Sequence, residues 1–408
     1  MNTILAGMRV IEVSAYVAAP LGGMTLAQMG AEVIRIDGLR GGLDYRRWPV
    51  TEDDTSLFWC GLNKAKRSVA IDIASEEGRE LATALICAEG ADAGMLLTNM
   101  PARGWLDWEL LRQRRADLIQ LTVQGDRHGG SAVDYTVNPS VGLPLLTGPE
   151  LADASVVNHV LPAWDLITGQ MAAAGLLAAE RHRRLTGQGQ HVQLALEDVA
   201  LAVIAHLGFT AEAELGGRRE RVGNYLYGAF GRDFVLADGA RIMVVGLTAR
   251  QWKGLCEATG LQEPLQALAQ QLGLDWSREG DRYRARQAIA ALFEPWFASQ
   301  TLARVAPLLD RHGVCWSRYR EIAEVVASLA GDETNPMFSS VRQPGVGTLL
   351  TPGLPLRFSA CERQEARPAP RLGEHTERVL SELLGLSSAE FGKLVDRGVV
   401  AVARKEDA

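Results

Sequence analysis

Short apolar runs alternate with helix-like periodicities along the first third of the chain. Five of these runs have the length and composition of strands, and they cover residues 8–13, 31–37, 68–73, 93–99 and 118–125. Helical patterns connect them, including one that ends at Met29 and one from Ser75 to about Glu89. Strands that alternate with helices predict a parallel α/β sheet, whose ligands usually bind beyond the carboxyl ends of the strands. The loops to consider first therefore follow Val13, Asp37, Ile73, Asn99 and Gly125.

Longer helical patterns dominate the rest of the chain. A helix rich in Ala and Leu is predicted over residues 166–184, and a second helix over residues 191–209. Residues 231–247 predict a hairpin that turns at Asp238-Gly239, because an Asp-Gly pair between two apolar runs is typical of a tight β-turn. Mainly helical patterns then continue to about residue 329.

Composition and charge exclude several classes of function. The chain has 408 residues, 47% of them hydrophobic and 22% charged, and a formal net charge of −7. A negative chain is a poor partner for nucleic acid or for an anionic membrane, since both require a basic face. The most apolar long window, residues 166–179, is too short to span a bilayer, and the N-terminus lacks the pattern of a signal peptide.

The candidate metal and cofactor motifs are absent from the sequence. Five scattered cysteines without a CxxC pair predict a reduced, cytoplasmic protein that has neither disulfides nor structural zinc. The seven histidines show no ligand spacing, so no metal site is predicted. Complete GxGxxG, GxxxxGK[ST] and GxSxG patterns are also missing, although Gly22 and Gly23 lie in the first predicted turn.

Four separated motifs, in the same order, resemble those of class III CoA-transferases. They are the Leu-x-Gly-x-x-Val opening at Leu5 with MGAEVIRID after it, the N-x-x-KRSV segment at Asn63, the D-x-x-TG segment WDLITGQ with its later TGQGQ, and the C-terminal segment 366–401. The resemblance covers residues 5 to 401. It implies a CoA-transferring enzyme that acts on an acyl-CoA substrate and needs no cofactor beyond the coenzyme A of that substrate.

The resemblance assigns the catalytic nucleophile to Asp165, which opens the D-x-x-TG helix. It implies that the carboxylate attacks the thioester, that an acyl–aspartyl anhydride forms, and that CoA thiolate converts it into an aspartyl-CoA thioester. Read from the residues alone, Asp165 is equally well placed as the N-cap of its helix, and the helix dipole is expected to favour the ionised carboxylate. The two readings are compatible.

Several loops at strand ends match the CoA-contacting positions of the family. By resemblance, the CoA-binding residues are Val17, Ala18, Arg40, Arg47, Ile71, Asp72, Ile73, Asn99, Met100 and Arg103. The arginines suit phosphate groups, because a guanidinium binds phosphate through two parallel hydrogen bonds. For any one of them, a solvated surface charge remains the alternative.

One segment distinguishes subgroups of the family. The racemases of the family have a His base where this chain has Val133, which cannot accept a proton. The segments DYTVNP, NHVLPAWD and ALEDVALAVIAHLGF resemble mesaconyl-CoA (2-methylfumaryl-CoA) isomerases, which move CoA between the two carboxyl groups of one C5 diacid. An intermolecular CoA-transferase is the alternative enzyme, and a CoA-binding regulatory protein is the alternative outside catalysis.

The same subgroup suggests an acyl pocket. Trp164 is expected to narrow the pocket, Tyr135 and Asn138 to bind the carboxylate that does not react, and Gly216-Gly217 to form a mobile loop over the site. Ordinary packing residues and a plain surface turn are the alternatives.

The resemblance also implies an interlocked homodimer with a Rossmann-like large domain and a smaller α+β domain. The large CoA-binding domain is expected over residues 1–190 and is completed by residues 371–408. The small domain is expected over residues 223–330, between linkers at residues 191–222 and 331–370.

Overall fold

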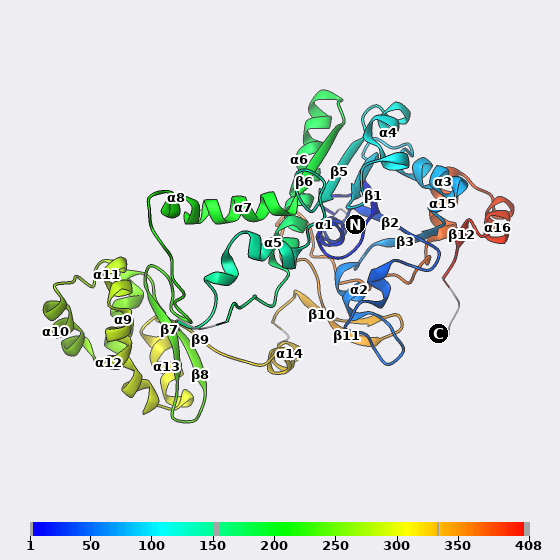
Figure 1. Ribbon diagram of the computed structural model, residues 1–408. Coiled ribbons are helices and arrows are strands. Elements are labelled where there is room, and N and C mark those ends of the chain that lie inside the picture. The colour runs from blue at the N-terminus through cyan, green and yellow to red at the C-terminus, as the bar shows by residue number, and fades with distance from the viewer. Residues whose placement is uncertain (1–2, 151–154, 333, 404–408) are drawn as a thin grey trace. The chain divides into compact units, whose positions relative to one another are not determined.

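A computed structural model describes residues 3–150, 155–332 and 334–403. The chain divides into two compact units, each built from separate segments (Figure 1). The first unit comprises residues 1–141, 160–212 and 329–408, and the second comprises residues 142–159 and 213–328. None of the described helices is both long enough and apolar enough to cross a membrane.

The first unit is built on a seven-stranded sheet with the order β12-β3-β2-β1-β4-β5-β6. Its strands are β1 (Arg9–Val13), β2 (Glu32–Asp37), β3 (Arg67–Ile71), β4 (Met95–Thr98), β5 (Ile119–Gln124), β6 (Gln190–Ala195) and β12 (Val400–Ala401). Six strands are parallel, and β12 pairs antiparallel with β3. The predicted α/β class and all five predicted strands are confirmed.

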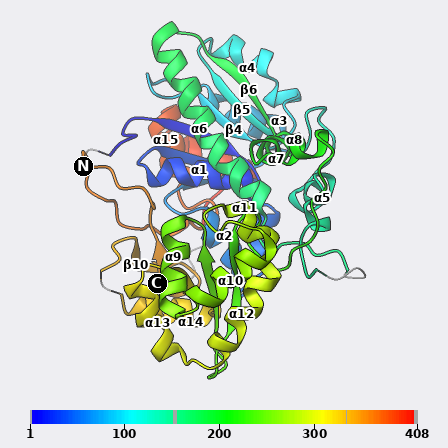
Figure 2. The ribbon, with the colours of Figure 1, turned by 90° about the vertical axis from the view of Figure 1, so that its left-hand side faces the viewer.

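Helices cover both faces of this sheet. The helical elements of the unit are α1 (Ala18–Gln28), η1 (Leu43–Arg46), α2 (Leu57–Leu62), α3 (Glu76–Ile86), η2 (Gly104–Leu106), α4 (Trp108–Arg114), α5 (Asp134–Ser140), α6 (Ala163–Thr186), α7 (Leu196–His206), α15 (Thr376–Leu384) and α16 (Ser388–Asp396). Alternate strand residues point to opposite faces. Val10 therefore packs with α1 and α6, whereas Ile11 packs with α3 and α15. Figure 2 shows α1 and α6 together on one face.

One predicted helix is partly wrong. The segment predicted as a helix over residues 191–209 begins as the edge strand β6, which pairs with β5, and becomes α7 only at Leu196. No Gly or Pro separates the strand from the helix, so the apolar periodicity runs across the boundary.

The second unit combines a three-stranded antiparallel sheet with helices. Its elements are η3 (Leu143–Leu145), β7 (Phe230–Val235), β8 (Arg241–Gly246), α9 (Ala249–Thr259), α10 (Gln262–Leu272), α11 (Glu279–Arg284), α12 (Arg286–Ala298), α13 (Leu302–Arg311) and β9 (Cys315–Arg318). The predicted hairpin is confirmed, because β7 and β8 pair antiparallel around Asp238.

Four further elements remain: two helices that cross the boundaries between the units and two strands of the first unit. They are α8 (Phe209–Glu214), α14 (Ile322–Ala330) and a hairpin of β10 (Phe338–Gln343) with β11 (Gly347–Pro352). Residues 331–370, which were expected to form a linker, therefore contain regular antiparallel pairing.

Candidate active site

The strand order reverses between β1 and β4, and the loops that follow these two strands are tied together. The Asn99 side chain accepts a hydrogen bond from the Ala15 N–H at 2.9 Å and donates one to the Ala15 carbonyl oxygen at 2.7 Å. A reversal of strand order leaves a crevice at the carboxyl ends of the strands, where ligands bind to doubly wound sheets. Val17 and Ala18, at the start of α1, and Asn99 and Met100, after β4, therefore lie at the expected ligand edge.

Helices α1 and α6 approach closely beside this edge, because glycines face each other. A Cβ atom on Gly169 would lie 2.7 Å from the Ala18 carbonyl oxygen, and one on Gly22 would lie 3.0 Å from the Gly169 carbonyl oxygen. Gly169 follows Asp165 by four residues and so shares its side of the helix. The Thr-Gly of the D-x-x-TG motif thus brings the start of α1, which holds two predicted CoA contacts, close to Asp165.

Asp165 lies in the first turn of α6 and is not its N-cap, so the predicted capping role is wrong. The helix begins at Ala163, and Pro162 occupies the cap position without a side-chain acceptor. The acceptor comes instead from α5: Oδ2 of the buried Asp134 accepts the N–H groups of Trp164 at 2.7 Å and of Asp165 at 3.1 Å. Helix N-termini need such acceptors for their free N–H groups.

The electrostatic surroundings of Asp165 also differ from the expectation that the helix dipole keeps it ionised. Burial, and then the negative charge of Asp134, raise the pKa of Asp165 to about 7, against a smaller opposing effect of Arg47. Such a value places Asp165 among perturbed groups that are common at functional sites. At neutral pH the carboxyl group lies near the midpoint between its acid and its basic form.

Arg47 is the predicted CoA-binding arginine whose charge acts on Asp165. Its guanidinium carbon lies 4.7 Å from the centre of the Phe58 ring and 5.7 Å from that of Tyr16. Tyr16 has a positive φ of 68°, and its N–H donates to Asp44 Oδ1 at 2.9 Å. The loop before α1 therefore contacts both η1 and the residue that follows it.

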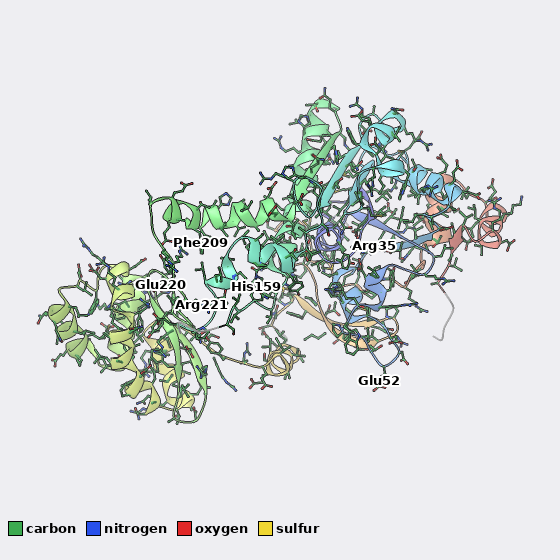
Figure 3. The ribbon with its side chains drawn as sticks, in the orientation of Figure 1. Arg35, Glu52, His159, Phe209, Glu220 and Arg221 are labelled. Atoms are coloured by element: carbon green, nitrogen blue, oxygen red, sulfur yellow. The ribbon has the colours of Figure 1, made fainter. Side chains whose placement is uncertain are left out.

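A buried network of charges surrounds Arg35, which belongs to β2 and is labelled in Figure 3. Arg35 is 1% exposed and forms ion pairs with Glu12, Asp37 and Asp44. It also donates to the Ser14 carbonyl oxygen at 2.8 Å. One guanidinium thus joins the end of β1, the end of β2 and η1.

The remaining predicted CoA contacts are more scattered. Ile71 is buried at the end of β3, where it pairs with Val400, and Asp72 and Ile73 form the turn that leads to α3. Arg40 and Arg103 are exposed. Among the described residues, no hydrogen bond or ion pair connects these five residues with Asp165.

The predicted acyl-pocket residues separate into three groups. Trp164 is 2% exposed, and its indole N–H donates to Oδ1 of the buried Asn138 at 3.3 Å, so these two side chains pack together. Tyr135 is 53% exposed on α5. Gly216 and Gly217 are exposed and belong to the second unit.

Sequence reasoning missed Asp134, Arg35 and Asp44. Asp134 stands at the first position of its own helix, where it reads as a local helix-start residue. The signal that points to it is the sequence Pro162-Ala163, which provides no capping side chain and so requires an acceptor from another element.

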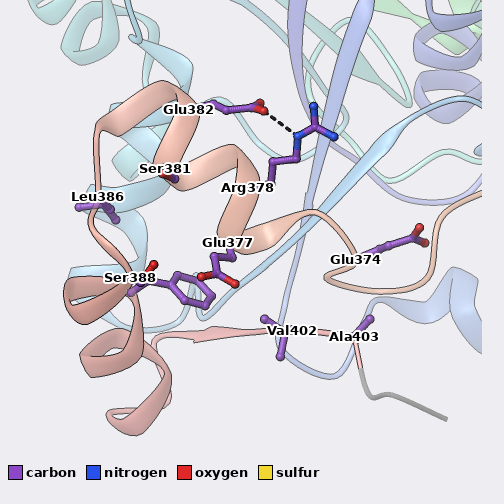
Figure 4. Close-up of a pocket in the computed structure, with 10 residues that line it drawn as sticks. Glu374, Glu377, Arg378, Ser381, Glu382, Leu386, Ser388, Val402 and Ala403 are labelled. Carbon is purple, nitrogen blue, oxygen red and sulfur yellow. Dashed lines mark hydrogen bonds and ion pairs between the residues drawn. The ribbon is translucent and has the colours of Figure 1, made fainter.

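A separate cavity of about 790 Å³ lies at the far edge of the sheet, between α15, α16 and the end of β12 (Figure 4). Its lining includes the ion pair of Arg378 with Glu382. None of the predicted site residues lines it, so the candidate active site remains the edge beside Asp165.

Comparison with known proteins places this geometry in a family. The sequence pattern of CoA-transferase family III matches residues 5–376. The chain is 60% identical over 404 residues to 2-methylfumaryl-CoA isomerase of Chloroflexus aurantiacus, with 98% of each chain covered. It is 28% identical to succinate–glutarate CoA-transferase of Agrobacterium fabrum, with coverage of 93% of this chain and 95% of the relative.

A solved structure shares the fold. The crystal structure of a CAIB/BAIF family protein from Brucella suis matches with a TM-score of 0.76 at 25% identity, and covers 94% of this chain and 100% of that one. The family resemblance that the four motifs predicted is thus confirmed in sequence and in structure, and the chain belongs to CoA-transferase family III.

Proposed function

We propose that this enzyme moves coenzyme A between the two carboxyl groups of a single C5 unsaturated diacid, and so isomerises 2-methylfumaryl-CoA. The observation that carries the proposal is the 60% identity, over nearly the full length of both chains, with a 2-methylfumaryl-CoA isomerase. Relatives that transfer CoA between two different acids, such as succinate–glutarate CoA-transferase, are only 28% identical.

Asp165 is the proposed nucleophile. Its carboxylate attacks the thioester carbonyl, the C–S bond breaks, and CoA leaves as a thiolate, which produces a mixed anhydride. The thiolate then attacks the aspartyl carbonyl of the anhydride, and the diacid leaves with both carboxylates free. An aspartyl-CoA thioester remains on the enzyme.

The second half of the cycle reverses these steps at the other end of the diacid. The second carboxylate attacks the aspartyl thioester and expels CoA thiolate again. The thiolate attacks the substrate carbonyl of the new anhydride, which releases the isomeric CoA ester and restores the Asp165 carboxylate. No proton is gained or lost overall. A diacid kept within the site reacts at a high effective concentration, so no second acid is needed.

The surroundings of Asp165 support this chemistry. The group is largely shielded from water, which protects an anhydride from hydrolysis, and its raised pKa makes the ionised form a stronger nucleophile than an ordinary aspartate. Arg47 offers a cation beside Asp165 that suits an anionic part of the substrate. We further propose that Val17, Ala18, Asn99 and Met100 contact the CoA moiety at the edge formed by β1 and β4.

A label-exchange experiment tests the intramolecular route. Purified enzyme receives 2-methylfumaryl-CoA together with ¹³C-labelled free mesaconate, and products are followed by liquid chromatography and mass spectrometry. We expect the isomeric ester to form at a rate that does not depend on the free acid, and without incorporation of the label. Label in the CoA esters, or a requirement for added acid, would support the intermolecular transferase instead.

A trapping experiment tests the nucleophile. Borohydride or hydroxylamine added during turnover is expected to modify Asp165, which peptide mass spectrometry detects as a mass change on the peptide that contains it. Asp165→Ala is expected to abolish both the modification and turnover. Full turnover by Asp165→Ala would contradict the role of this residue, and no turnover by the wild type with any CoA ester would favour a CoA-binding regulatory protein.

A further inference from the structure

Asp134 is a buried carboxylate that contacts the helix of the nucleophile but has no part in the reaction steps above. It is 1% exposed and lies at the first position of α5. Oδ2 accepts two hydrogen bonds, from the N–H groups of Trp164 and Asp165. Because Pro162 provides no acceptor, Asp134 stabilises the first turn of α6 from outside that helix.

The second oxygen of Asp134 lacks the donors that the first one has. Oδ1 is buried and has no hydrogen-bond partner among the described residues. A buried carboxylate oxygen without a donor is costly, and its charge acts over a greater range than it would in water, because the surroundings have a low dielectric constant. The negative charge next to Asp165 is therefore poorly neutralised on this side.

Asp134 is the main negatively charged neighbour of Asp165. Helix α1, which packs against α6, carries no ionisable side chain. Helix α5 carries Asp134 and Tyr135, and the segment after η1 carries Arg47. Of these, Asp134 raises the pKa of Asp165 and Arg47 lowers it.

The other elements that pack on α6 carry few charges. Strand β6 has His191, whose Nε2 lies 2.9 Å from Thr122 Oγ1 of β5. The first turn of α7 has Glu197 and Asp198, and Asp198 pairs with Arg127. None of these groups contributes to the shift of Asp165.

We propose that Asp134 is a positioning residue for the nucleophile: Oδ2 fixes the backbone at Asp165, and the poorly neutralised negative charge beside Asp165 controls the reactivity of that carboxylate. This inference rests on the proposed role of Asp165 as nucleophile. Two like charges close together in a buried site cannot both ionise easily. The Asp134 carboxylate is stabilised by two N–H donors, so Asp165 is the group that retains its proton to a higher pH. A stronger base attacks the thioester carbonyl more readily once it is ionised.

Replacement of Asp134 by Asn separates charge from capping. Asn keeps an oxygen that can accept the two N–H groups but removes the negative charge. Asp107 offers a matched control, because its Oδ1 accepts the N–H groups of Glu109 and Leu110 at the start of α4. Asp107→Asn makes the same chemical change at a helix start away from the candidate site.

Infrared titration of the resting protein measures the effect directly. The carboxyl band of Asp165 is identified as the one that Asp165→Asn removes, and its midpoint in the wild type is expected near pH 7. In Asp134→Asn the midpoint should fall by about one pH unit or more, whereas Asp107→Asn should leave it unchanged. An unaltered midpoint in Asp134→Asn overturns the proposal. If that variant does not fold, Asp134→Ser, which is neutral and keeps a hydroxyl acceptor, replaces it.

Kinetics provide the second measurement. The acid limb of kcat/KM reports the free enzyme and should move to lower pH in Asp134→Asn, with a plateau reduced about tenfold. If the wild type is inactive and no CoA is found on Asp165, the proposed function is refuted. The infrared titration would still show whether Asp134 raises the pKa of Asp165. If the enzyme is active but Asp134→Asn changes neither its rate nor the titration midpoint of Asp165, only the role of Asp134 is refuted.

Discussion

Gly169 packs so tightly on Ala18 that a Cβ atom at Gly169 would lie 2.7 Å from the Ala18 carbonyl oxygen. This contact joins the helix that carries Asp165 to the first turn of α1, where the loop after β1 ends. The spacing between Asp165 and Gly169 is one helical turn, so the motif D-x-x-TG encodes both the carboxylate of Asp165 and the surface that positions it.

Gly169→Ala is therefore expected to impair the enzyme without touching a reacting group. The added methyl meets backbone, which cannot move aside as a side chain can, so α1 and α6 must separate. We expect a loss of about 1–3 kcal/mol in the free energy of unfolding and a lower kcat/KM, measured by urea denaturation and steady-state kinetics. Gly392→Ala on α16 is the control, because nothing lies within 4 Å of its added methyl. Equal effects of the two changes would contradict this account.

The raised pKa of Asp165 predicts a dependence of stability on pH. The folded protein has a pKa of about 7 at a carboxyl group whose ordinary value is 3.8, so the native state retains a proton that the unfolded chain releases above about pH 4. The free energy of unfolding therefore falls as pH rises from about 4 to about 7.

Asp165→Asn removes this effect. The stability of the variant relative to the wild type should increase over the same pH window, by up to about 4 kcal/mol before solvent screening reduces it. Thermal unfolding of both proteins at pH 4, 6 and 8 measures the difference. A constant difference across the series would contradict the raised pKa.

The fold was largely predictable because its signals are local. The first five strands are apolar runs separated by helices, and the hairpin around Asp238 has a characteristic turn pair. Strand β6 escaped prediction because its edge position leaves it half exposed and its sequence continues without a break into α7.

The site was predictable only in part, because its electrostatics depend on contacts between distant segments. The motif identified Asp165, but the pKa of that residue depends on Asp134, which lies 31 positions away. Likewise, the alternation of apolar and polar positions in β2 does not reveal the partners of Arg35. Three carboxylates surround it: Glu12 from β1, Asp44 from η1 and Asp37 from its own strand.

Arg35→Met is expected to destabilise the first unit strongly. The substitution retains much of the volume but leaves the buried carboxylates of Glu12, Asp37 and Asp44 with one cation fewer. Loss of one partner from a buried ion network costs about 3–5 kcal/mol. Arg114→Met, which breaks an exposed pair with Glu80, should cost less than about 1 kcal/mol. Urea denaturation of both variants measures the contrast, and similar losses would show that burial is not the cause.

Arg47→Gln tests the remaining charge near Asp165. The guanidinium favours the ionised carboxylate and lowers the pKa of Asp165, so its removal should raise that pKa further above 7. The acid limb of kcat/KM should consequently move to higher pH, opposite in direction to the shift expected for Asp134→Asn. Arg46→Gln removes the same charge from the neighbouring, exposed position and should leave the acid limb in place. If both substitutions moved the limb equally, general surface charge rather than the charge of Arg47 would control the ionisation of Asp165.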